Sequence, residues 1–448
     1  MNAIPPAATD RRPLPSVRFN GLMLLGDVAF YLIGMSFIDT STALPAIVRS
    51  LGGDAAFLGL LLSLRQAASF LAPVLIAHSL QGASRYKPIL VQVCLWGRIG
   101  LFPTAAAVYF LGDRFPFLAL TVLTVALVLA WLGDGAGAVP WTALVGKMIP
   151  ARQRGRLFAA TQVVAGVSRL ILSGGVAVLL SGRYVAFPQN MGLLLLLCAL
   201  SLAVSWGFIA SFREPEPTDD TPDSTPSPGF FAYLRSLPGQ MREHPTFLLL
   251  ATVQIFLTAT GAGMPFLIGY AESLGTRMPE RLPFGLQGLV GIFEGGMPGL
   301  FLAVQTAGML LCAPLWGWVN DRFGPKTAVV GLLGTALSCP LLAALGGISG
   351  GNLTLFLLAY LLFGASMDWW IPITNYLIES VPTEKQATFL GLMSVASSPS
   401  LLLPLVAGFL MRQTGGLAVF TETFVLILLG LALALRLPGT RRHVSSVG

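Results

Sequence analysis

The sequence predicts an all-α polytopic membrane protein with twelve transmembrane helices in two six-helix, pseudo-symmetric halves. The chain has 448 residues, of which 54% are hydrophobic and only 10% are charged, against about 25% charged in a typical soluble domain. Its 20 acidic and 27 basic residues could not cover the surfaces of the roughly three soluble domains that this length would form. The mean hydropathy of +0.76 and the 50 Gly and 31 Pro residues are instead typical of membrane helices.

Twelve apolar stretches are long enough to cross a bilayer, which takes about 20 residues in a helix. In the first half they cover residues 20–48, 55–78, 89–111, 116–149, 157–180 and 190–211. In the second half they cover residues 246–274, 298–319, 327–345, 353–381, 388–411 and 418–435. The stretch from Gly285 to Gly296 is apolar but glycine-rich and too short to span, so we expect an external or re-entrant segment there.

The rest of the chain is expected to form two tails, short loops and one linker. We expect a tail at 1–19, a first bundle at 20–211, a linker at 212–245, a second bundle at 246–435 and a second tail at 436–448. The linker is rich in proline and acidic residues, which is typical of a solvated connection. No apolar core precedes Asn20, so we expect no cleavable signal peptide and a first span that acts as its own signal.

The basic residues between the spans predict the orientation. With the N-terminus inside, eighteen Lys and Arg residues lie in inner loops and tails, and six lie in outer loops. Since cytoplasmic loops carry the excess of basic residues, both termini and the linker are predicted to lie in the cytoplasm and the protein in the inner membrane. Basic residues spread over the loops in this way form no patch for nucleic acid.

The two halves show traces of an internal repeat. Val139-Pro140 is followed ten residues later by Ile149-Pro150, and Ile371-Pro372 is followed ten residues later by Val381-Pro382. The two sets are 232 residues apart. Duplication of one six-helix unit is the simplest explanation.

Two motifs resemble signatures of the major facilitator superfamily. Residues 317–326 read GWVNDRFGPK, which is similar to the family's loop G-x-x-x-D-R-x-G-R-[RK]. Residues 133–140 and 149–156 read GDGAGAVP and IPARQRGR, which is similar to the family's fourth-helix pattern ending in P-x-x-R-G-R. Together with the span count, the resemblance extends over essentially the whole chain. It implies a fold in which spans one, four, seven and ten line a central cavity that rocking of the halves exposes to each side in turn.

The loop motif predicts a tight turn with a charge lock. Its candidate residues are Gly317, Asp321, Arg322, Gly324, Lys326 and Glu379. Gly324 permits the turn, and Arg322 is expected to reach Glu379 at the inner end of a neighbouring helix. In the first half, Ser84 and Lys147 stand at the corresponding positions, so no lock is expected there. The alternative for both loops is a plain positively charged inner loop.

Charged residues inside the spans are the sharpest functional indication, because each costs about 2.5–3.5 kcal/mol at mid-helix unless it is paired or faces water. Counting residues from the helix ends predicts three pairs at matching depth. These are Asp39 with Arg65, Asp134 with Arg169, and Asp27 with Arg98. The pairs either belong to a binding site or serve as structural ion pairs.

The second half has one acid in its tenth span, Asp368, and no Arg or Lys in any span. A lone carboxyl in a low-dielectric medium favours its neutral form, which suits it to carrying a proton or binding a cationic substrate. A protonated side chain bonded to its own backbone is the alternative. The candidate substrate- or proton-binding residues are Asp27, Asp39, Arg65, Arg98, Asp134, Arg169, Gln254, Asp368, Trp369 and Asn375.

No motif indicates an enzyme, a cofactor or a metal site. The three histidines, His78, His244 and His443, are far apart in the sequence, and the four cysteines lie inside apolar runs, which is typical of buried thiols. No nucleophile elbow, zinc spacing or nucleotide loop is present. We therefore expect no catalytic activity.

The resemblance implies a secondary active transporter of a small molecule, and the lone acid suggests that protons drive it. The expected partners are the substrate, protons and the lipid bilayer, with a monomer as the working unit. Two alternatives stay open. One is a multidrug efflux antiporter, although residues 166–170 read GVSRL where such antiporters carry a Gly-Pro motif. The other is a membrane sensor that binds a ligand without moving it.

Overall fold

The computed structural model describes residues 14–80, 83, 85–216, 239, 244–276, 297–381 and 386–439. These residues include twelve helices that are long and apolar enough to cross a membrane, which confirms the predicted twelve spans and the all-helical membrane class. The stretch from Gly285 to Gly296, most of the linker and the outer parts of both tails lie outside the described residues.

The first half consists of α1 (Leu14–Phe37), α2 (Ala43–Ser50), α3 (Ala55–Leu80), α4 (Lys87–Ile99), α5 (Leu101–Leu111), α6 (Pro116–Met148), α7 (Ala151–Leu180) and α8 (Gln189–Ala210). Helices α4 and α5 together form one span, 87–111. In this bundle α1 packs on α7 and α8, whereas α3, α4 and α5 pack on α6. These neighbours decide which charged side chains meet.

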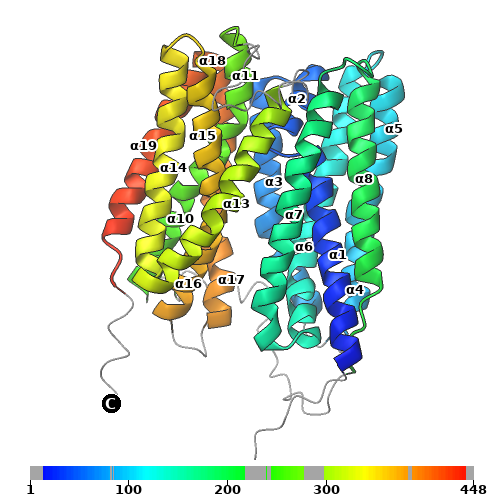
Figure 1. The fold of residues 1–448 in the computed structure, drawn as a ribbon, viewed down its shortest axis with the longest axis vertical. Helices are drawn as coiled ribbons and strands as arrows, with labels where there is room; N and C mark the ends of the chain where they lie inside the picture. Colours follow the sequence, from blue (N-terminus) through cyan, green and yellow to red (C-terminus); the bar gives the residue numbers. More distant parts are fainter. Residues whose placement is uncertain are drawn as a thin grey trace, which may run out of the picture.

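The second half consists of α10 (Pro245–Gly263), η1 (Met264–Phe266), α11 (Leu267–Ser273), α13 (Met297–Phe323), α14 (Pro325–Ile348), α15 (Leu353–Ala365), η3 (Met367–Trp369), α16 (Trp370–Ser380), α17 (Gln386–Ala396), η5 (Ser398–Leu401), α18 (Leu402–Thr414) and α19 (Gly416–Leu435). Here α14 packs on α15 and α19, α13 packs on α15, and α10 packs on α19. The two bundles stand side by side, and the start of α1 and the end of α19 point toward the same end of the molecule (Figure 1).

Two of the interrupted spans, which the sequence predicted as continuous, carry an acid at the interruption. The first span is interrupted between α1 and α2, where the Asp39 carboxylate accepts hydrogen bonds from the Ser41 amide at 3.0 Å, the Ser41 hydroxyl at 2.6 Å and the Thr42 hydroxyl at 3.0 Å. Such local bonds compete with the helical ladder. The tenth span is interrupted at η3, where Asp368 leaves helical geometry at φ −84° and ψ 24°. Both acids therefore lie where a helix is interrupted, which membranes tolerate only inside protein or beside a cavity.

The two bundles are held together at the end of the molecule that carries α2, α11 and the end of α18, which we call the closed face (Figure 1). Across it, Arg49 pairs with Glu272 at 2.5 Å and Arg412 pairs with Asp54 at 3.2 Å. Below these pairs, α3 packs on α18 and α7 packs on α13. Toward the opposite end, where α1 begins and α19 ends, the ribbons of the two bundles diverge (Figure 1). We call that end the termini face.

Replacing Gly59 by leucine is expected to loosen the closed face. A Cβ at Gly59 would lie 2.9 Å from the Cα of Gly408, so a larger side chain forces α3 and α18 apart. The measurement is cross-linking between Asp54→Cys and Arg412→Cys in a background without other cysteines. Gly59→Leu should reduce the cross-linked fraction by about tenfold, the effect of about 1.4 kcal/mol at the interface.

The matched control for this experiment is Gly207→Leu in α8, where an added Cβ meets no atom within 4 Å. It should cross-link like the parent. If both leucine variants cross-link equally, the packing of α3 on α18 is not what holds the closed face together.

Candidate functional site

A cavity of about 230 Å³ lies between the two bundles, beneath the closed face. Its walls come from the break between α1 and α2, from α3, α10, α15 and α18, and from η3. The polar lining residues are Asp39, Thr40, Ser41, Arg65, Gln66, Gln254, Thr258, Thr260 and Ser366. Of the residues predicted from the sequence, Asp39, Arg65, Gln254 and Trp369 line this cavity. Both halves therefore contribute predicted residues to one site.

Asp39 is the best satisfied charge of the cavity wall. Its second carboxylate oxygen forms an ion pair with the guanidinium of Arg169 from α7, and the two side chains are 10% and 13% exposed. The predicted pairing of Asp39 with Arg65 is therefore wrong, because α1 packs on α7 and α8 whereas α3 packs on α6. Arg65 interacts with Asp39 through space but forms no ion pair within the described residues.

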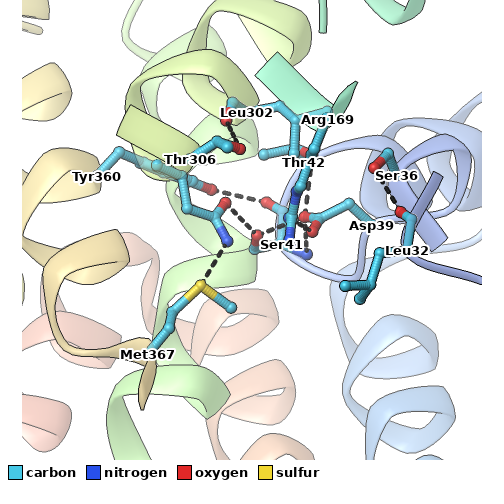
Figure 2. Close-up of polar contacts among 11 residues, drawn as sticks. Leu32, Ser36, Asp39, Ser41, Thr42, Arg169, Leu302, Thr306, Tyr360 and Met367 are labelled. Atoms are coloured by element: carbon cyan, nitrogen blue, oxygen red, sulfur yellow. Dashed lines mark hydrogen bonds and ion pairs between the residues drawn. The ribbon is translucent and has the colours of Figure 1, made fainter. Parts of the chain in front are cut away.

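The same break binds the second bundle. The Tyr360 hydroxyl of α15 donates to the Ser41 carbonyl oxygen at 2.6 Å, and the Met264 carbonyl oxygen lies 3.2 Å from that hydroxyl. The Gln305 amide oxygen lies 2.9 Å from the Ser41 hydroxyl, and its amide nitrogen contacts the Met367 sulfur at 3.0 Å. Figure 2 shows Ser41 lying between Tyr360 of the second bundle and Asp39 of the first.

Sequence reasoning missed this cross-bundle contact. Tyr360 and Gln305 are fully buried, and a polar group in an apolar helix needs a partner. The sequence therefore indicated only that Tyr360 and Gln305 need hydrogen-bond partners, and not which residues these partners are.

A second polar cluster lies inside the first bundle. Arg98 of α4 donates to Asp134 of α6 at 3.4 Å and to the Leu202 carbonyl oxygen at 3.2 Å. The Tyr31 hydroxyl also donates to Asp134, at 3.2 Å. The predicted pair of Asp134 with Arg169 is therefore wrong, because α6 packs on α4 whereas α7 packs on α1.

Asp27 and Arg98, which the sequence predicted to pair directly, are instead joined through Ser205. The Ser205 hydroxyl donates to Asp27 at 2.6 Å and accepts from Arg98 at 3.0 Å. The indole nitrogen of Trp141 donates to the other Asp27 oxygen at 2.9 Å. A separate cavity of about 330 Å³ lies beside this cluster and is lined by residues of the first bundle only. Each acid in this cluster thus has two hydrogen-bond donors.

Asp368 differs from the other intramembrane acids. Its side chain is half-buried and forms no hydrogen bond or ion pair with any other described residue. Its neighbours Met367 and Trp369 line the cavity, whereas Asp368 and Asn375 are not among the lining residues.

The loop between α13 and α14 contains the predicted turn. Gly324 has φ 90° and ψ 162°, a backbone conformation that favours glycine, and the Lys326 ammonium donates to the Leu435 carbonyl oxygen at 3.1 Å. Arg322 and Glu379 are both exposed, and within the described residues Glu379 forms no ion pair. The expected lock between these two residues is therefore not made in this conformation.

The first half carries a charge contact at the corresponding place, where none was expected. The side chain of Glu214, only 5% exposed, accepts the amide N–H groups of Tyr86 and Lys87 at 3.0 and 2.9 Å, at the start of α4. It also pairs with Lys147 at 3.4 Å. A carboxylate at a helix N-terminus is favourable, and an acid just after a span was the only sequence signal.

Two helical bundles around a polar cavity that both of them line define a multi-pass membrane protein with a cavity between its halves. A sequence model described as Major Facilitator Superfamily matches residues 294–447. Multidrug resistance protein MdtG of Rahnella sp. (strain Y9602) is 31% identical over 180 residues, which is 39% of this chain and 40% of that protein. The chain thus matches about two fifths of the length of this relative.

Solved structures resemble the whole chain. A POT family transporter in complex with 5-aminolevulinic acid matches with a TM-score of 0.65 at 13% identity, over 94% of this chain and 96% of the other. A bacterial homologue of the iron transporter ferroportin, in an inward-facing state, matches with a TM-score of 0.61 at 14% identity, over 96% of this chain and 100% of the other. Residues 294–447 thus resemble the major facilitator superfamily in sequence, and the chain shares the overall fold of these solved transporters.

Removing one partner of the Asp39–Arg169 pair is expected to destabilise the protein strongly. Asp39→Asn or Arg169→Gln should each lower the free energy of unfolding by about 3–5 kcal/mol, since each leaves a buried charge unpaired. The double variant should lose clearly less than the two single losses together. Denaturant unfolding in detergent, followed by intrinsic fluorescence, measures all three.

The matched control is the exposed pair of Arg49 and Glu272, whose side chains are 46% and 36% exposed. Changing these residues to glutamine should alter the free energy of unfolding by about 1 kcal/mol or less. Additive losses at Asp39 and Arg169 would contradict their direct pairing.

Proposed function

We propose that the protein is a secondary active transporter that moves a small molecule across the inner membrane by alternating access, driven by protons. The observation that carries this proposal is the central cavity, whose wall residue Ser41 is also bonded across the bundle interface by Tyr360. Binding in the cavity and closure of the interface therefore involve the same short segment. That coupling is what alternating access needs.

The excess of basic residues in the predicted inner loops supports a cytoplasmic position for both termini. In that orientation the closed face points outward and the termini face, where the two bundles diverge, points toward the cytoplasm, so we propose that the conformation is inward-facing.

Asp368 is the proposed proton carrier. The acids of the first bundle each accept two donors, and Asp39 accepts four, so their charges are compensated where they lie. Asp368 lacks such donors in the described part of the chain and lies in the broken tenth span, next to two cavity residues. Gain or loss of one proton there changes the net charge beside the cavity without breaking an existing pair.

Multidrug efflux is a second candidate function. Two observations favour it, namely the similarity to multidrug resistance protein MdtG and the aromatic side chains of Phe70, Phe363 and Trp369 in the cavity wall. A sensor that binds without transport is a further alternative. Flux separates it from a transporter, since a sensor moves no ligand.

Proton coupling can be tested in liposomes that contain the purified protein and a trapped pH indicator. Compounds that raise the thermal stability of the protein are added, since a bound ligand stabilises the folded state. We expect at least one of them to drive proton movement that protein-free liposomes lack. Asp368→Asn should abolish this proton movement and keep exchange of the labelled compound.

Asp113→Asn is the control, because it makes the same chemical change at an exposed loop position and should behave like the parent. Transport that is independent of pH, or proton movement in Asp368→Asn equal to that of the parent, would contradict the proposal of proton coupling through Asp368. Stabilising compounds that never cross the membrane would favour the sensor.

A further inference from the structure

We propose that the central cavity selects a monoanionic organic molecule, a carboxylate with an apolar or aromatic body, and that Arg65 binds its carboxylate. This inference rests on the proposed transport function, because it names the substrate class of the same cavity. It differs from a cavity for cationic drugs, and the two can be told apart by experiment.

The charge balance of the cavity wall is the first argument. The charged lining residues are Asp39 and Arg65, and Asp39 is already paired with Arg169 behind the wall. Two guanidinium groups therefore accompany one carboxylate, which leaves a net charge of about +1 on the group formed by Asp39, Arg65 and Arg169. Arginine stays protonated in proteins, so this charge persists until an anion compensates it.

The position of Arg65 supports the same conclusion. It lies ten residues along α3, at mid-depth in the span, where an uncompensated charge is costly. Within the described residues no acid pairs with it, and its side chain lines the cavity. The guanidinium fork matches a carboxylate with two parallel hydrogen bonds. A ligand carboxylate would supply the ion-pair partner that Arg65 lacks among the described residues.

An unpartnered hydroxyl is the second, independent observation. Thr260 of α10 lines the cavity and is only 3% exposed, yet its hydroxyl has no hydrogen-bond partner in the described part of the chain. A buried hydroxyl without a partner costs free energy. It belongs to the second bundle, whereas Arg65 belongs to the first, so one ligand held by both would join the two halves.

The size and the apolar walls of the cavity limit the class of ligand that fits it. A volume of about 230 Å³ lies below the range of about 300–1,000 Å³ for drug-sized ligands. Phe70, Phe363 and Trp369 supply flat apolar surface, which suits an aromatic ring. A cation would face the net positive charge, so the same residues discriminate against it.

The test compares acids with their neutral and cationic analogues. The probes are benzoate, phenylacetate, cinnamate and 1-naphthoate, each with its amide and its primary amine, and the readout is the apparent Kd from ligand-induced thermal stabilisation of the full-length protein in detergent. We expect at least one acid to bind about tenfold more tightly than its amide and amine. Arg65→Gln should remove this preference, and Arg65→Lys should keep part of it.

Two further variants protect the test against misfolding. Arg114→Gln removes an arginine from an exposed loop and should bind like the parent. Thr260→Val keeps the side-chain shape and should weaken binding of the same acid severalfold, so it carries the test if Arg65→Gln does not fold. The proposal is overturned if no acid binds better than its amide, if an amine binds best, or if the acid preference survives in Arg65→Gln.

Flux of the same probes into proteoliposomes separates this inference from the proposed function. An acid that binds through Arg65 but never crosses the membrane would contradict transport and leave the anion site standing. Amines that cross while acids neither bind nor cross would leave transport standing and overturn the anion site.

Discussion

The carboxylate of Asp39 lies within the membrane-spanning part of the chain, where an ionised group is costly unless it is paired. Its demand for donors is met by Ser41 and Thr42, which interrupt the first span, and by Arg169, which joins α1 to α7. The interruption in turn exposes the Ser41 carbonyl oxygen to Tyr360 of the other bundle. One buried charge thus shapes the helix break, the cavity wall and the bundle interface.

The first bundle compensates its other buried charges internally. Arg98 joins α4, α6 and α8 through Asp134, Ser205 and the Leu202 carbonyl oxygen. Glu214 fixes the start of α4 and the end of α6 at the termini face. The second bundle lacks such a cluster among its described spans. The interruptions of the second bundle at η1, η3 and η5 therefore lie in spans that have no such charge cluster among the described residues.

The span count and the presence of buried charge pairs could be predicted from the sequence, because bilayer thickness and the cost of charge act on every chain alike. The partner of each buried charge could not be predicted. The depth of a residue along its span does not say which neighbouring helix it faces. Arg65 and Arg169 each matched the depth of an acid with which they form no ion pair. The choice depended on α1 packing against α7 and on α6 packing against α4. The breaks were missed because they follow from side-chain competition for the backbone at Asp39, and apolar run length does not report that competition.

The arrangement of charges connects ligand binding to the interface. Asp39 is shared by the cavity, by Arg169 and by the segment that Tyr360 holds. A ligand that draws Arg65 toward its own carboxylate changes the field at Asp39, and a ligand can shift a conformational equilibrium only through such differential interactions. The contacts that close this face are two exposed ion pairs and the packing of α3 on α18 and of α7 on α13, and Gly59 and Gly408 let the backbones of α3 and α18 approach closely. In the transport cycle proposed above, a change at the cavity therefore acts through Ser41 on the interface that has to separate.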